Sequence, residues 1–386
     1  MSLRSGLTTG TCAAAAAKAA ALVLAGGDAP RSVELQLPSG QAVRVPILHV
    51  APRADGAAAT AVVRKDAGDD PDATHGLEIR VTVAWDDQAD VAFVAGEGVG
   101  TVTKPGLQIP PGQPAINPVP RQMITAAIRA VTSRGVRVEV AIPGGREVAT
   151  RTFNPRLGIV GGLSILGTTG VVRPYCVSAL RDALTCSLDV AAACGETAVV
   201  FVPGNIGARS ARQHFFLREE QVIEVGNEWG FLLDELVSPR LSTQGGEAGG
   251  EGLIGVESRS PRPGTPGRGV GGEGSRAFHA LLVLGHPGKL AKLGDGQWDT
   301  HSARSPPPLE TIRRLCSSLP TAQNTTVEGL FAALPPPERK SLAEALAERI
   351  RAAVSQRIGE HLPVAVFLVN MVGECLGTAG DLGPWR

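Results

Sequence analysis

Three short glycine-containing segments could together bind a small molecule. They are residues 203–207 (PGNIG), 226–230 (GNEWG) and 285–289 (GHPGK), and each follows an apolar run typical of a strand. Glycine lets a backbone approach a ligand closely, and a helix that begins in such a turn offers free N–H groups. One such turn is ordinary, but three at the carboxyl ends of strands in one sheet predict a pocket.

Two histidines near these turns are candidates for acid–base chemistry. His286 belongs to the third turn, and His301 follows in the polar segment WDTHSARS. Imidazole changes its charge near neutral pH, so two histidines beside one cleft suggest a general base or an anchor for a ligand. The alternative is that both histidines are structural or exposed to solvent.

Two threonine-rich turns could bind an anion. Residues 7–11 (LTTGT) and 167–170 (GTTG) both place hydroxyls and backbone amides at a turn before an expected helix. Such arrangements bind carboxylates or phosphates. The alternative is N-capping alone, with Thr11 as the cap of an alanine-rich helix over residues 13–24. The candidate hydroxyls belong to Thr8, Thr9, Thr11, Thr168 and Thr169.

Cys12 lies at the start of the same alanine-rich helix. A helix N-terminus can lower the pKa of a thiol and make it a nucleophile. The sequence has no other nucleophile machinery, such as a G-x-S-x-G elbow, so we expect Cys12 to be a packing residue.

The glycine- and proline-rich stretch 96–120 is a further candidate for binding. Its first residues, GEGVG, are similar to a dinucleotide-binding fingerprint, but that fingerprint must lead into a helix. Six prolines between residues 105 and 120 exclude such a helix. A loop of this length with apolar anchors is usually functional or disordered, and we predict an ordered binding loop.

The elements expected to position these residues form two domains. Strand-like alternation, then a helix and a further strand, predict an α+β domain over residues 1–155. After it, strands, glycine turns and helices alternate, which predicts a Rossmann-like α/β domain with a mainly parallel sheet over residues 156–386. Residues 241–276 contain twelve glycines in 36 positions without periodicity, so we expect a flexible insertion there.

Composition excludes several classes of protein. The 386 residues contain 37 Lys+Arg, 37 Asp+Glu and 4% aromatics, without the basic surplus of a nucleic-acid binder. The six cysteines form no C-x-x-C pair, which argues against a zinc site and against a disulfide framework. No apolar stretch approaches the ~20 residues of a membrane span, so we expect a cytoplasmic protein. A phosphate-binding P-loop, which a kinase or ligase would need, is also missing.

Seven motifs occur in the order typical of one known family. They are LRSGLTTGTCAAAAAKAA, GVGTVTKPGL, GQPAINPVPR, GLSILGTTGVVRP, VPGNIG, GNEWGFLLDE and GHPGKLAKLGDGQWDTHS. By these motifs the chain resembles, nearly end to end, the cobalt-precorrin-5B C(1)-methyltransferase (CbiD) family of anaerobic cobalamin biosynthesis.

The resemblance implies transfer of a methyl group from S-adenosylmethionine to C-1 of cobalt-precorrin-5B, giving cobalt-precorrin-6A. Cobalt would then belong to the substrate, and no metal bound by the protein itself is expected. The acetate and propionate arms of the substrate would suit the threonine turns. The cations expected to pair with these arms are Lys104, Arg121, Arg173 and Lys289.

The sheet argument places S-adenosylmethionine at the strand ends. The residues expected to contact it are Gly204, Asn205, Gly207, Gly226 and Asn227. His286 and His301 would handle a proton or steer the substrate.

The sequence departs from the family at two places, and an alternative function stays open. The insertion 241–276 is unusual, and the three prolines of 306–308 follow the THS motif, where we expect them to affect the orientation of His301. The alternative is a non-catalytic corrinoid or tetrapyrrole carrier or scaffold in the same pathway. Whether the chain forms a homo-oligomer is also open.

Overall fold

The computed structural model describes residues 3–88, 90–174, 176–238, 278–315, 326–359 and 362–386. These residues form two compact units, and the chain passes from unit 1 to unit 2 between Cys176 and Val177. The insertion predicted at 241–276 lies outside the described residues.

The segment after residue 155, which we expected to open the second domain, stays with unit 1. Two short antiparallel pairings hold it there. β10 (Ile159–Val160) pairs with β8 (Thr101–Val102), and β11 (Val171–Val172) pairs with β1 (Gly6–Leu7). Pairing with strands so early in the chain therefore moves the division of the chain beyond residue 155.

Unit 1 is built on a five-stranded sheet. Along the sheet the strands are β4 (His49–Pro52), β5 (Ala58–Arg64), β6 (Glu78–Trp85), β9 (Val136–Ala141) and β7 (Val91–Ala95). Neighbours are antiparallel, except that β7 runs parallel to β9. A separate hairpin joins β2 (Ser32–Gln36) and β3 (Ala42–Pro46), and a short helix α3 (Gly145–Ala149) follows β9. Helices beside a mostly antiparallel sheet agree with the predicted α+β class.

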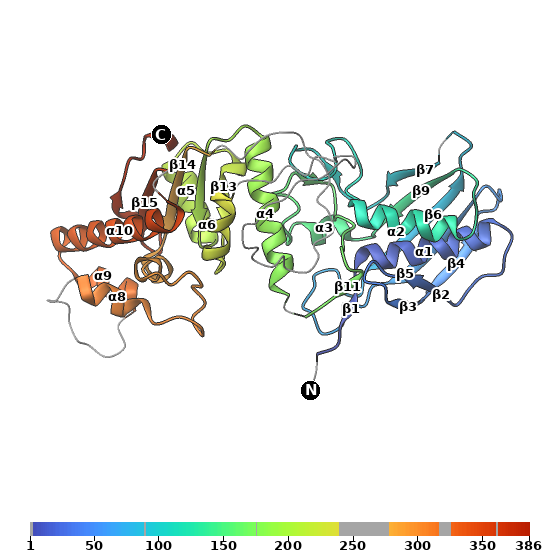
Figure 1. The fold of residues 1–386 in the computed structure, drawn as a ribbon, viewed down its shortest axis with the longest axis horizontal. Helices are drawn as coiled ribbons and strands as arrows, with labels where there is room; N and C mark the ends of the chain where they lie inside the picture. The colour runs from blue at the N-terminus through green and yellow to red at the C-terminus, as the bar shows by residue number, and fades with distance from the viewer. Residues whose placement is uncertain (1–2, 89, 175, 239–277, 316–325, 360–361) are drawn as a thin grey trace, which may run out of the picture. The chain divides into compact units, whose positions relative to one another are not determined.

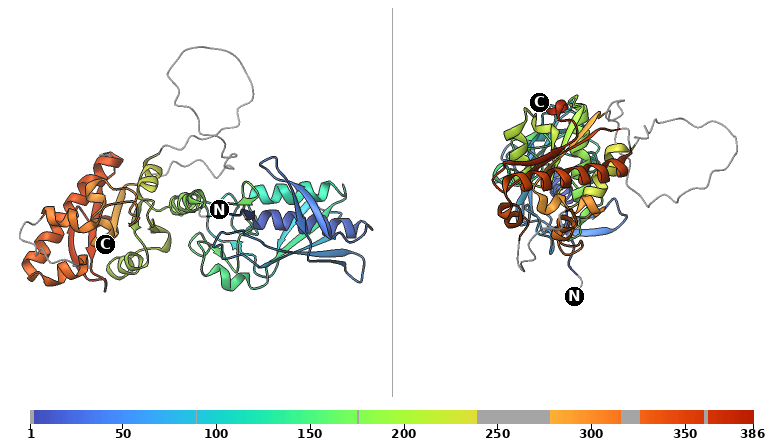
Figure 2. Two further views of the ribbon diagram at one scale, coloured as in Figure 1. Left: turned by 90° about the horizontal axis from the view of Figure 1, so that it is seen from below. Right: turned by 90° about the vertical axis from the view of Figure 1, so that its left-hand side faces the viewer.

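One face of this sheet is covered by helices. Ala61 in β5 and Val81 in β6 are fully buried on one face of the sheet, while Thr60 and Arg80 lie on the other face. α1 (Thr9–Leu24) packs against β5 and β6. α2 (Pro118–Arg129) lies beside α1 in both Figure 1 and Figure 2.

The alanines of α1 allow this close packing. Every residue from Thr9 to Ala17 is buried, and Ala13 to Ala17 have no exposed surface. A side chain at Gly10 would come within 2.8 Å of Cγ of Pro120 in α2. A helix surrounded so closely has room only for small residues.

The prediction that Thr11 caps α1 is wrong. The N-cap is Thr8, whose hydroxyl oxygen accepts the N–H of Thr11 at 3.2 Å. The helix therefore begins four residues before the alanine run. Each of the three threonines is a good cap by type, and the neighbouring segment decides which one acts.

The long loop 96–120 contains no helix before Pro118, as its prolines predict. GEGVG leads into the two-residue strand β8, so the rejection of the dinucleotide fingerprint is confirmed. The loop is anchored by buried residues, among them Val99, Ile109 and Ile116.

Unit 2 is built on a second five-stranded sheet, seen in Figure 1. Its strands, in spatial order, are β13 (Val222–Glu224), β12 (Ala198–Val202), β14 (Ala280–Gly285), β15 (Val364–Val369) and β16 (Cys375–Ala379). The first four are parallel, as predicted, and β16 is antiparallel to β15.

Helices cover both faces of this sheet. Phe201, Ile223 and Val283 point to one face, with α4 (Val177–Ala193), α6 (Trp229–Val237) and α10 (Pro336–Ile358). Val200, Val222 and Leu282 point to the other face, with α5 (Asn205–His214) and the 3₁₀ turn η3 (Gly383–Trp385). The remaining elements are η1 (Glu219–Gln221), α7 (Pro287–Leu290), η2 (Leu293–Asp295), α8 (Pro308–Leu315) and α9 (Val327–Ala333).

No helix of the described residues combines the length and the hydrophobicity of a membrane-spanning segment.

The packing of α1 predicts that a larger side chain in its middle destabilises unit 1. We expect Ala15→Leu to lower the free energy of unfolding by about 1–3 kcal/mol, the usual cost of overpacking. Ala25→Leu, at the exposed C-cap of the same helix, is the matched control and should have little effect. Urea unfolding measures both, and equal stabilities would contradict the packing described here.

Candidate functional site

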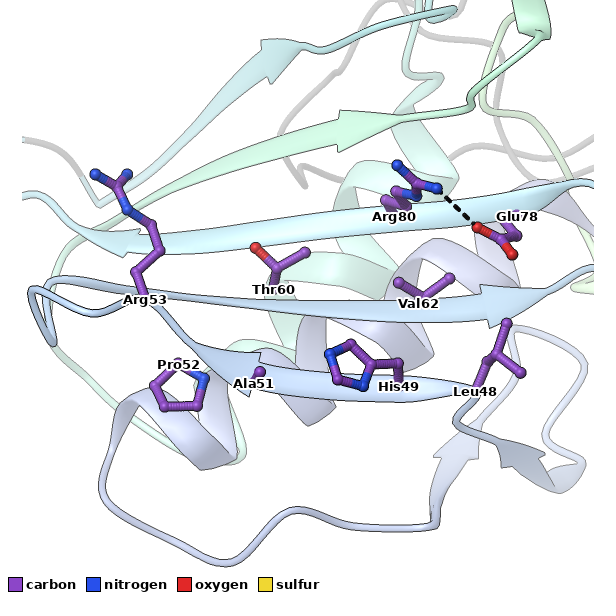
Figure 3. Close-up of a pocket in the computed structure, with 9 residues that line it drawn as sticks. All are labelled: Leu48, His49, Ala51, Pro52, Arg53, Thr60, Val62, Glu78 and Arg80. Carbon is purple, nitrogen blue, oxygen red and sulfur yellow. Dashed lines mark hydrogen bonds and ion pairs between the residues drawn. The ribbon is translucent and has the colours of Figure 1, made fainter.

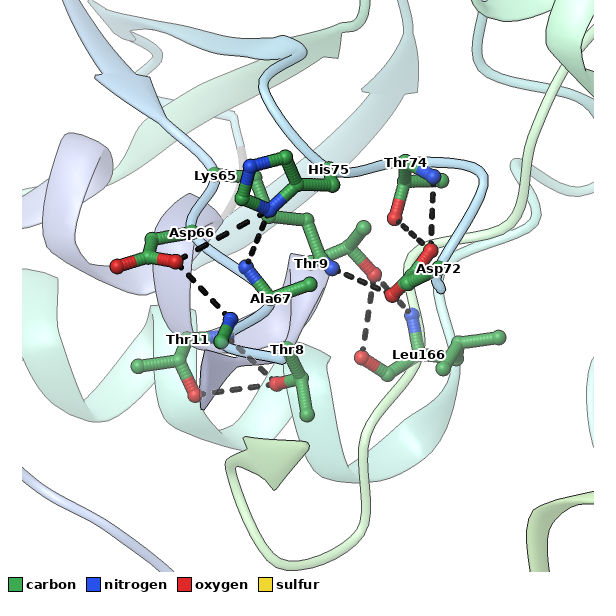
Figure 4. Close-up of polar contacts among 11 residues, drawn as sticks. Thr8, Thr9, Thr11, Lys65, Asp66, Ala67, Asp72, Thr74, His75 and Leu166 are labelled. Carbon is green, nitrogen blue, oxygen red and sulfur yellow. Dashed lines mark hydrogen bonds and ion pairs between the residues drawn. The ribbon is translucent and has the colours of Figure 1, made fainter. Parts of the chain in front are cut away.

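The threonines at the start of α1 hold the turn that follows residue 165 (Figure 4). The Thr9 hydroxyl donates to the carbonyl of Leu166 at 3.2 Å and accepts the N–H of the same residue at 3.0 Å. The Thr11 hydroxyl donates to the carbonyl of Gly170 at 2.7 Å. The two threonine motifs, far apart in the sequence, therefore form one structure.

Direct binding of an anion by the hydroxyls of Thr8, Thr9 and Thr11 is not supported. All three side chains are buried, and each hydroxyl is hydrogen-bonded within the protein. A ligand would have to break these bonds, so we assign the three threonines to positioning the 166–170 turn. In that turn Thr168 and Thr169 are exposed, and the Thr169 hydroxyl bonds to the backbone of Val171.

A buried ion pair that the sequence did not indicate lies beside the threonines (Figure 4). Nζ of Lys65, a side chain with 1% exposure, donates to Oδ2 of Asp72 at 2.6 Å. Burial raises the pKa of Asp72, but hydrogen bonds from Lys65 and Thr74 outweigh this effect and leave the pKa below its usual value. The pair holds the segment after β5, and no local motif signals it.

Cys12 is a packing residue, as expected. The side chain is fully buried, and burial raises the pKa of its thiol to about 12. A thiol with this pKa stays protonated at neutral pH and is not a nucleophile.

The long loop reaches the same turn through α2. The N–H of Asn117, the N-cap of α2, donates to the carbonyl of Ile165 at 3.0 Å. The N–H of Gly10 in α1 donates to the next carbonyl, that of Leu166, at 3.0 Å. The starts of both helices and the 166–170 turn are thus brought together.

Among the predicted cations of unit 1, Arg121 is the one best suited to bind an anion. Its Nε donates to the carbonyl of Ile116 at 2.8 Å and its Nη2 to that of Pro114 at 3.2 Å. The guanidinium lies 5.2 Å from the ring centre of Phe93. It is half-buried, and this burial lowers its pKa. It forms no ion pair with an acid of the described residues, and a guanidinium has five N–H groups, so donors remain for a carboxylate.

The other predicted cations have different surroundings. Lys104 is half-buried, and its side chain packs so closely that a Cβ at Gly158 would lie 2.4 Å from its Cγ. Arg173 directly follows β11 and is exposed, as is Lys289 in α7 of unit 2.

In unit 2 the predicted strand-end residues share one edge of the sheet. Val202 pairs with Glu224, and Phe201 pairs with Val283, so the turns after β12, β13 and β14 follow at the same level. These turns contain Gly204, Asn205, Gly226, Asn227 and His286. The side-chain oxygen of Asn227 also accepts the hydroxyl of Thr300 at 3.2 Å, which ties the segment before His301 to this edge.

The prediction that Gly207 contacts a cofactor is not supported. Gly207 is buried where α5 crosses the sheet, and a Cβ there would lie 2.8 Å from Cβ of Val202 and 3.0 Å from the carbonyl of Leu284. Close packing of helix on sheet explains this glycine.

Hydrogen bonds to both candidate histidines oppose the general-base role. Nδ1 of His286 accepts the N–H of Gly288 at 3.0 Å, and Nδ1 of His301 accepts the N–H of Ala303 at 3.2 Å. Each neutral ring therefore has its proton on Nε2 and acts there as a donor. In His286 this proton is directed to Oε2 of Glu328 at 2.9 Å, a partner that the sequence did not indicate. His301 is exposed.

A groove of about 450 Å³ lies elsewhere, on the helix-free face of the unit 1 sheet (Figure 3). It is lined from β4, β5 and β6, by His49, Thr60 and Arg80 among others. The two arginines of the groove are already paired with acids. Arg80 lies 3.0 Å from Glu78, and Arg53, which directly follows β4, lies 2.9 Å from Asp55. None of the residues singled out in the sequence lines this groove.

Within the ranges that the structure describes, no three or more His, Cys, Asp and Glu side chains lie together so that they could hold a metal ion.

The double hydrogen bond of Thr9 predicts its effect on stability. Thr9→Val keeps the shape but leaves both backbone groups of Leu166 without this partner, so we expect a loss of about 1–3 kcal/mol in the free energy of unfolding. Thr9→Ser keeps the hydroxyl and should lose less, about 0.8 kcal/mol for the missing methyl group. Equal losses for the two variants in urea unfolding would show that the hydroxyl does not hold the turn.

The burial of Cys12 predicts its reactivity. In the folded protein at pH 8, iodoacetamide should modify the exposed Cys176 but leave Cys12 unmodified until urea is added. Peptide mass spectrometry measures both sites in one sample. Modification of Cys12 at the rate of Cys176 would contradict a buried, protonated thiol.

This chain is similar to a family model and to proteins of other organisms. The family model CbiD matches residues 1–174. A protein of Syntrophotalea carbinolica named cobalt-precorrin-5B C(1)-methyltransferase is 46% identical over 387 residues, covering 100% of this chain and 99% of that protein. A protein of Ralstonia nicotianae with the same name is 38% identical, covering 98% of this chain and 94% of that protein.

A solved structure is also similar in sequence. It is the cobalamin biosynthesis protein CbiD of Archaeoglobus fulgidus, 26% identical, covering 78% of this chain and 83% of that chain, with a TM-score of 0.37. By its full-length similarity to these relatives, the chain belongs to the CbiD family, as its motifs predicted.

Proposed function

We propose that this chain methylates C-1 of cobalt-precorrin-5B with S-adenosylmethionine, in cobalamin biosynthesis in the cytoplasm. The observation that carries this proposal is the 46% identity over 387 residues to a relative named for this reaction. Cobalt enters as part of the substrate.

The substrate carries carboxylate arms, and unit 1 supplies groups for them. Arg121 has guanidinium N–H groups left over from its two carbonyl bonds, and its partial burial strengthens a charge-assisted bond. Thr168 and Arg173 are exposed in and beside the turn that the buried threonines hold. We propose that these residues, with Lys104, bind substrate carboxylates. We assign Lys289 of unit 2 the same kind of contact.

We interpret unit 2 as Rossmann-like and assign the methyl donor to the carboxyl edge of its sheet. The residues there fit such a ligand, because no atom of the described residues would lie within 4 Å of a Cβ at Gly204 or Gly226. Asn205 and Asn227 directly follow these glycines and offer amide groups. When bound, S-adenosylmethionine supplies a methyl group on a sulfonium: C-1 donates an electron pair to the methyl carbon, and the S–CH₃ pair stays on sulfur in S-adenosylhomocysteine.

The chain's own contribution to such a reaction is mainly position. Alignment of two reactants can supply ~7–11 kcal/mol of the barrier. The exposed His301 presents an Nε2–H group, so we assign it to orienting a ligand as a donor and not to removing a proton. The Nε2–H of His286 is already bound to Glu328, so we assign His286 to steering the substrate through the position of its turn.

The direct test is an assay with purified protein, cobalt-precorrin-5B and methyl-¹³C-labelled S-adenosylmethionine. We expect the label at C-1 of the macrocycle by NMR, with an equal amount of S-adenosylhomocysteine. Tight binding of the macrocycle without transfer, in a sample shown to be folded, would instead support the carrier function.

Arg121 variants test the assignment of the substrate carboxylates. We expect Arg121→Gln to raise KM for the macrocycle about tenfold to a hundredfold, the range for a charge-assisted hydrogen bond. Arg121→Lys should recover part of the loss because the charge remains. Arg31→Gln, an exposed arginine outside every predicted site, is the control. An unchanged KM in Arg121→Gln would remove Arg121 from the binding site.

A further inference from the structure

We propose that Lys292 binds a ligand carboxylate at the carboxyl edge of the unit 2 sheet, from the methyl donor or from an arm of the macrocycle. This inference rests on the proposed function and deepens it, because it assigns one charged group of a ligand to one residue. Lys292 belongs to the motif GHPGKLAKLGDGQWDTHS, in which only His286, Lys289 and His301 have a role so far.

The first observation is that the ammonium of Lys292 is buried without an acid. The residue is 5% exposed. Its Nζ donates to the carbonyl of Thr300 at 3.1 Å and to the hydroxyl of Ser305 at 2.8 Å. Within the described ranges, no carboxylate forms an ion pair with it. An ammonium has three N–H donors, so one donor and the whole positive charge remain for a ligand.

The second observation is that the neighbouring charges do not compensate this ammonium. Asp299 favours the charged form of Lys292, but its carboxylate lies 2.7 Å from Arg304. The same carboxylate also accepts the N–H of His301 at 2.9 Å. Lys289, which is exposed, adds a second positive charge three residues before Lys292. Burial and the charge of Lys289 therefore lower the pKa of Lys292, and a further negative charge would stabilise its ammonium.

The third observation is the position of this charge in the fold. Lys292 directly precedes η2, shortly after α7, which follows β14. Thr300, which accepts one of its N–H groups, also donates to Asn227: the N–H to the carbonyl at 3.4 Å and the hydroxyl to the side-chain oxygen at 3.2 Å. Asn227 lies in the turn after β13. Hydrogen bonds thus connect the ammonium to the strand edge at which we place the methyl donor.

Holding residues 300–305 does not by itself require a charge. A neutral donor can bind a carbonyl and a hydroxyl, and its burial costs less free energy than burial of an ammonium. A buried charge is usually compensated by an opposite charge. A ligand carboxylate on the third N–H would supply this charge in a charge-assisted hydrogen bond. Residues 301–304 of the same segment are exposed, so the segment lies at the surface of unit 2.

The test compares ligands with and without a carboxylate. Calorimetry would measure binding of S-adenosylhomocysteine and of 5′-methylthioadenosine, which lacks the amino-acid part, to the natural protein and to Lys292→Gln. The glutamine amide keeps an N–H donor but removes the charge. If the methyl donor supplies the carboxylate, Lys292→Gln should bind S-adenosylhomocysteine about tenfold to a hundredfold more weakly, the range for a hydrogen bond to a charged group. Binding of 5′-methylthioadenosine should stay unchanged.

The macrocycle is tested in the same variant. If cobalt-precorrin-5B supplies the carboxylate, S-adenosylhomocysteine should bind Lys292→Gln as it binds the natural protein. KM for the macrocycle should then rise about tenfold to a hundredfold, with a smaller change in kcat. Lys292→Met, with an apolar side chain suited to a buried position, is the second neutral variant if circular dichroism shows that Lys292→Gln does not fold. Lys340→Gln, at an exposed lysine of α10, is the matched control and should behave as the natural protein.

Two results would overturn the assignment. One is equal weakening of S-adenosylhomocysteine and 5′-methylthioadenosine, because a residue that only positions the 300–305 segment does not distinguish a carboxylate. The other is unchanged binding of both ligands together with an unchanged KM for the macrocycle. Either result leaves the proposed function in place while the natural protein transfers the methyl group. Absence of transfer by the natural protein would instead contradict the proposed function.

Discussion

Unit 1 depends on the hydrogen bonds between the first turn of α1 and residues 166–170. The first turns of α1 are buried, because alanine leaves almost no side chain between the helix backbone and its neighbours. The N–H groups of the first turn therefore cannot bind water, and an unpaired buried N–H costs free energy. The Thr8 hydroxyl and the carbonyl of Leu166 accept these N–H groups. The alanines thus allow the helix to be buried, and the threonines before them supply the hydrogen bonds that this burial requires.

The same bonds decide which residues remain for a ligand. Consecutive carbonyls, of Ile165 and Leu166, accept N–H groups from the starts of α2 and α1. These two bonds attach the 166–170 turn to the starts of both helices. Thr168 in this turn is exposed, and Arg121 lies in the second turn of α2. The buried threonine hydroxyls thus determine where the exposed Thr168 is placed, although they are themselves bound within the protein.

The sequence predicted the architecture better than the partners of individual side chains. The parallel strands were predictable because buried strands are short apolar runs that end at glycine. Gly204 and Gly207 look alike in the sequence, yet one faces open space and the other supports a helix crossing. That difference depends on Val202 and Leu284, which lie against Gly207 in the folded sheet. The partner of His286, Glu328, comes from a helix 42 positions later, and no local pattern indicates such a pair.

The histidines show how such contacts change a functional interpretation. A histidine at a strand end suggests a base, but a backbone N–H two residues later occupies Nδ1 in both His286 and His301. Each ring is then a donor at Nε2. Methyl transfer from a sulfonium to carbon is compatible with this arrangement, because alignment of the two reactants can raise its rate. The positively charged sulfur already makes the methyl group reactive. The hydrogen bonds at the edge of the unit 2 sheet therefore do not favour removal of a proton by either histidine.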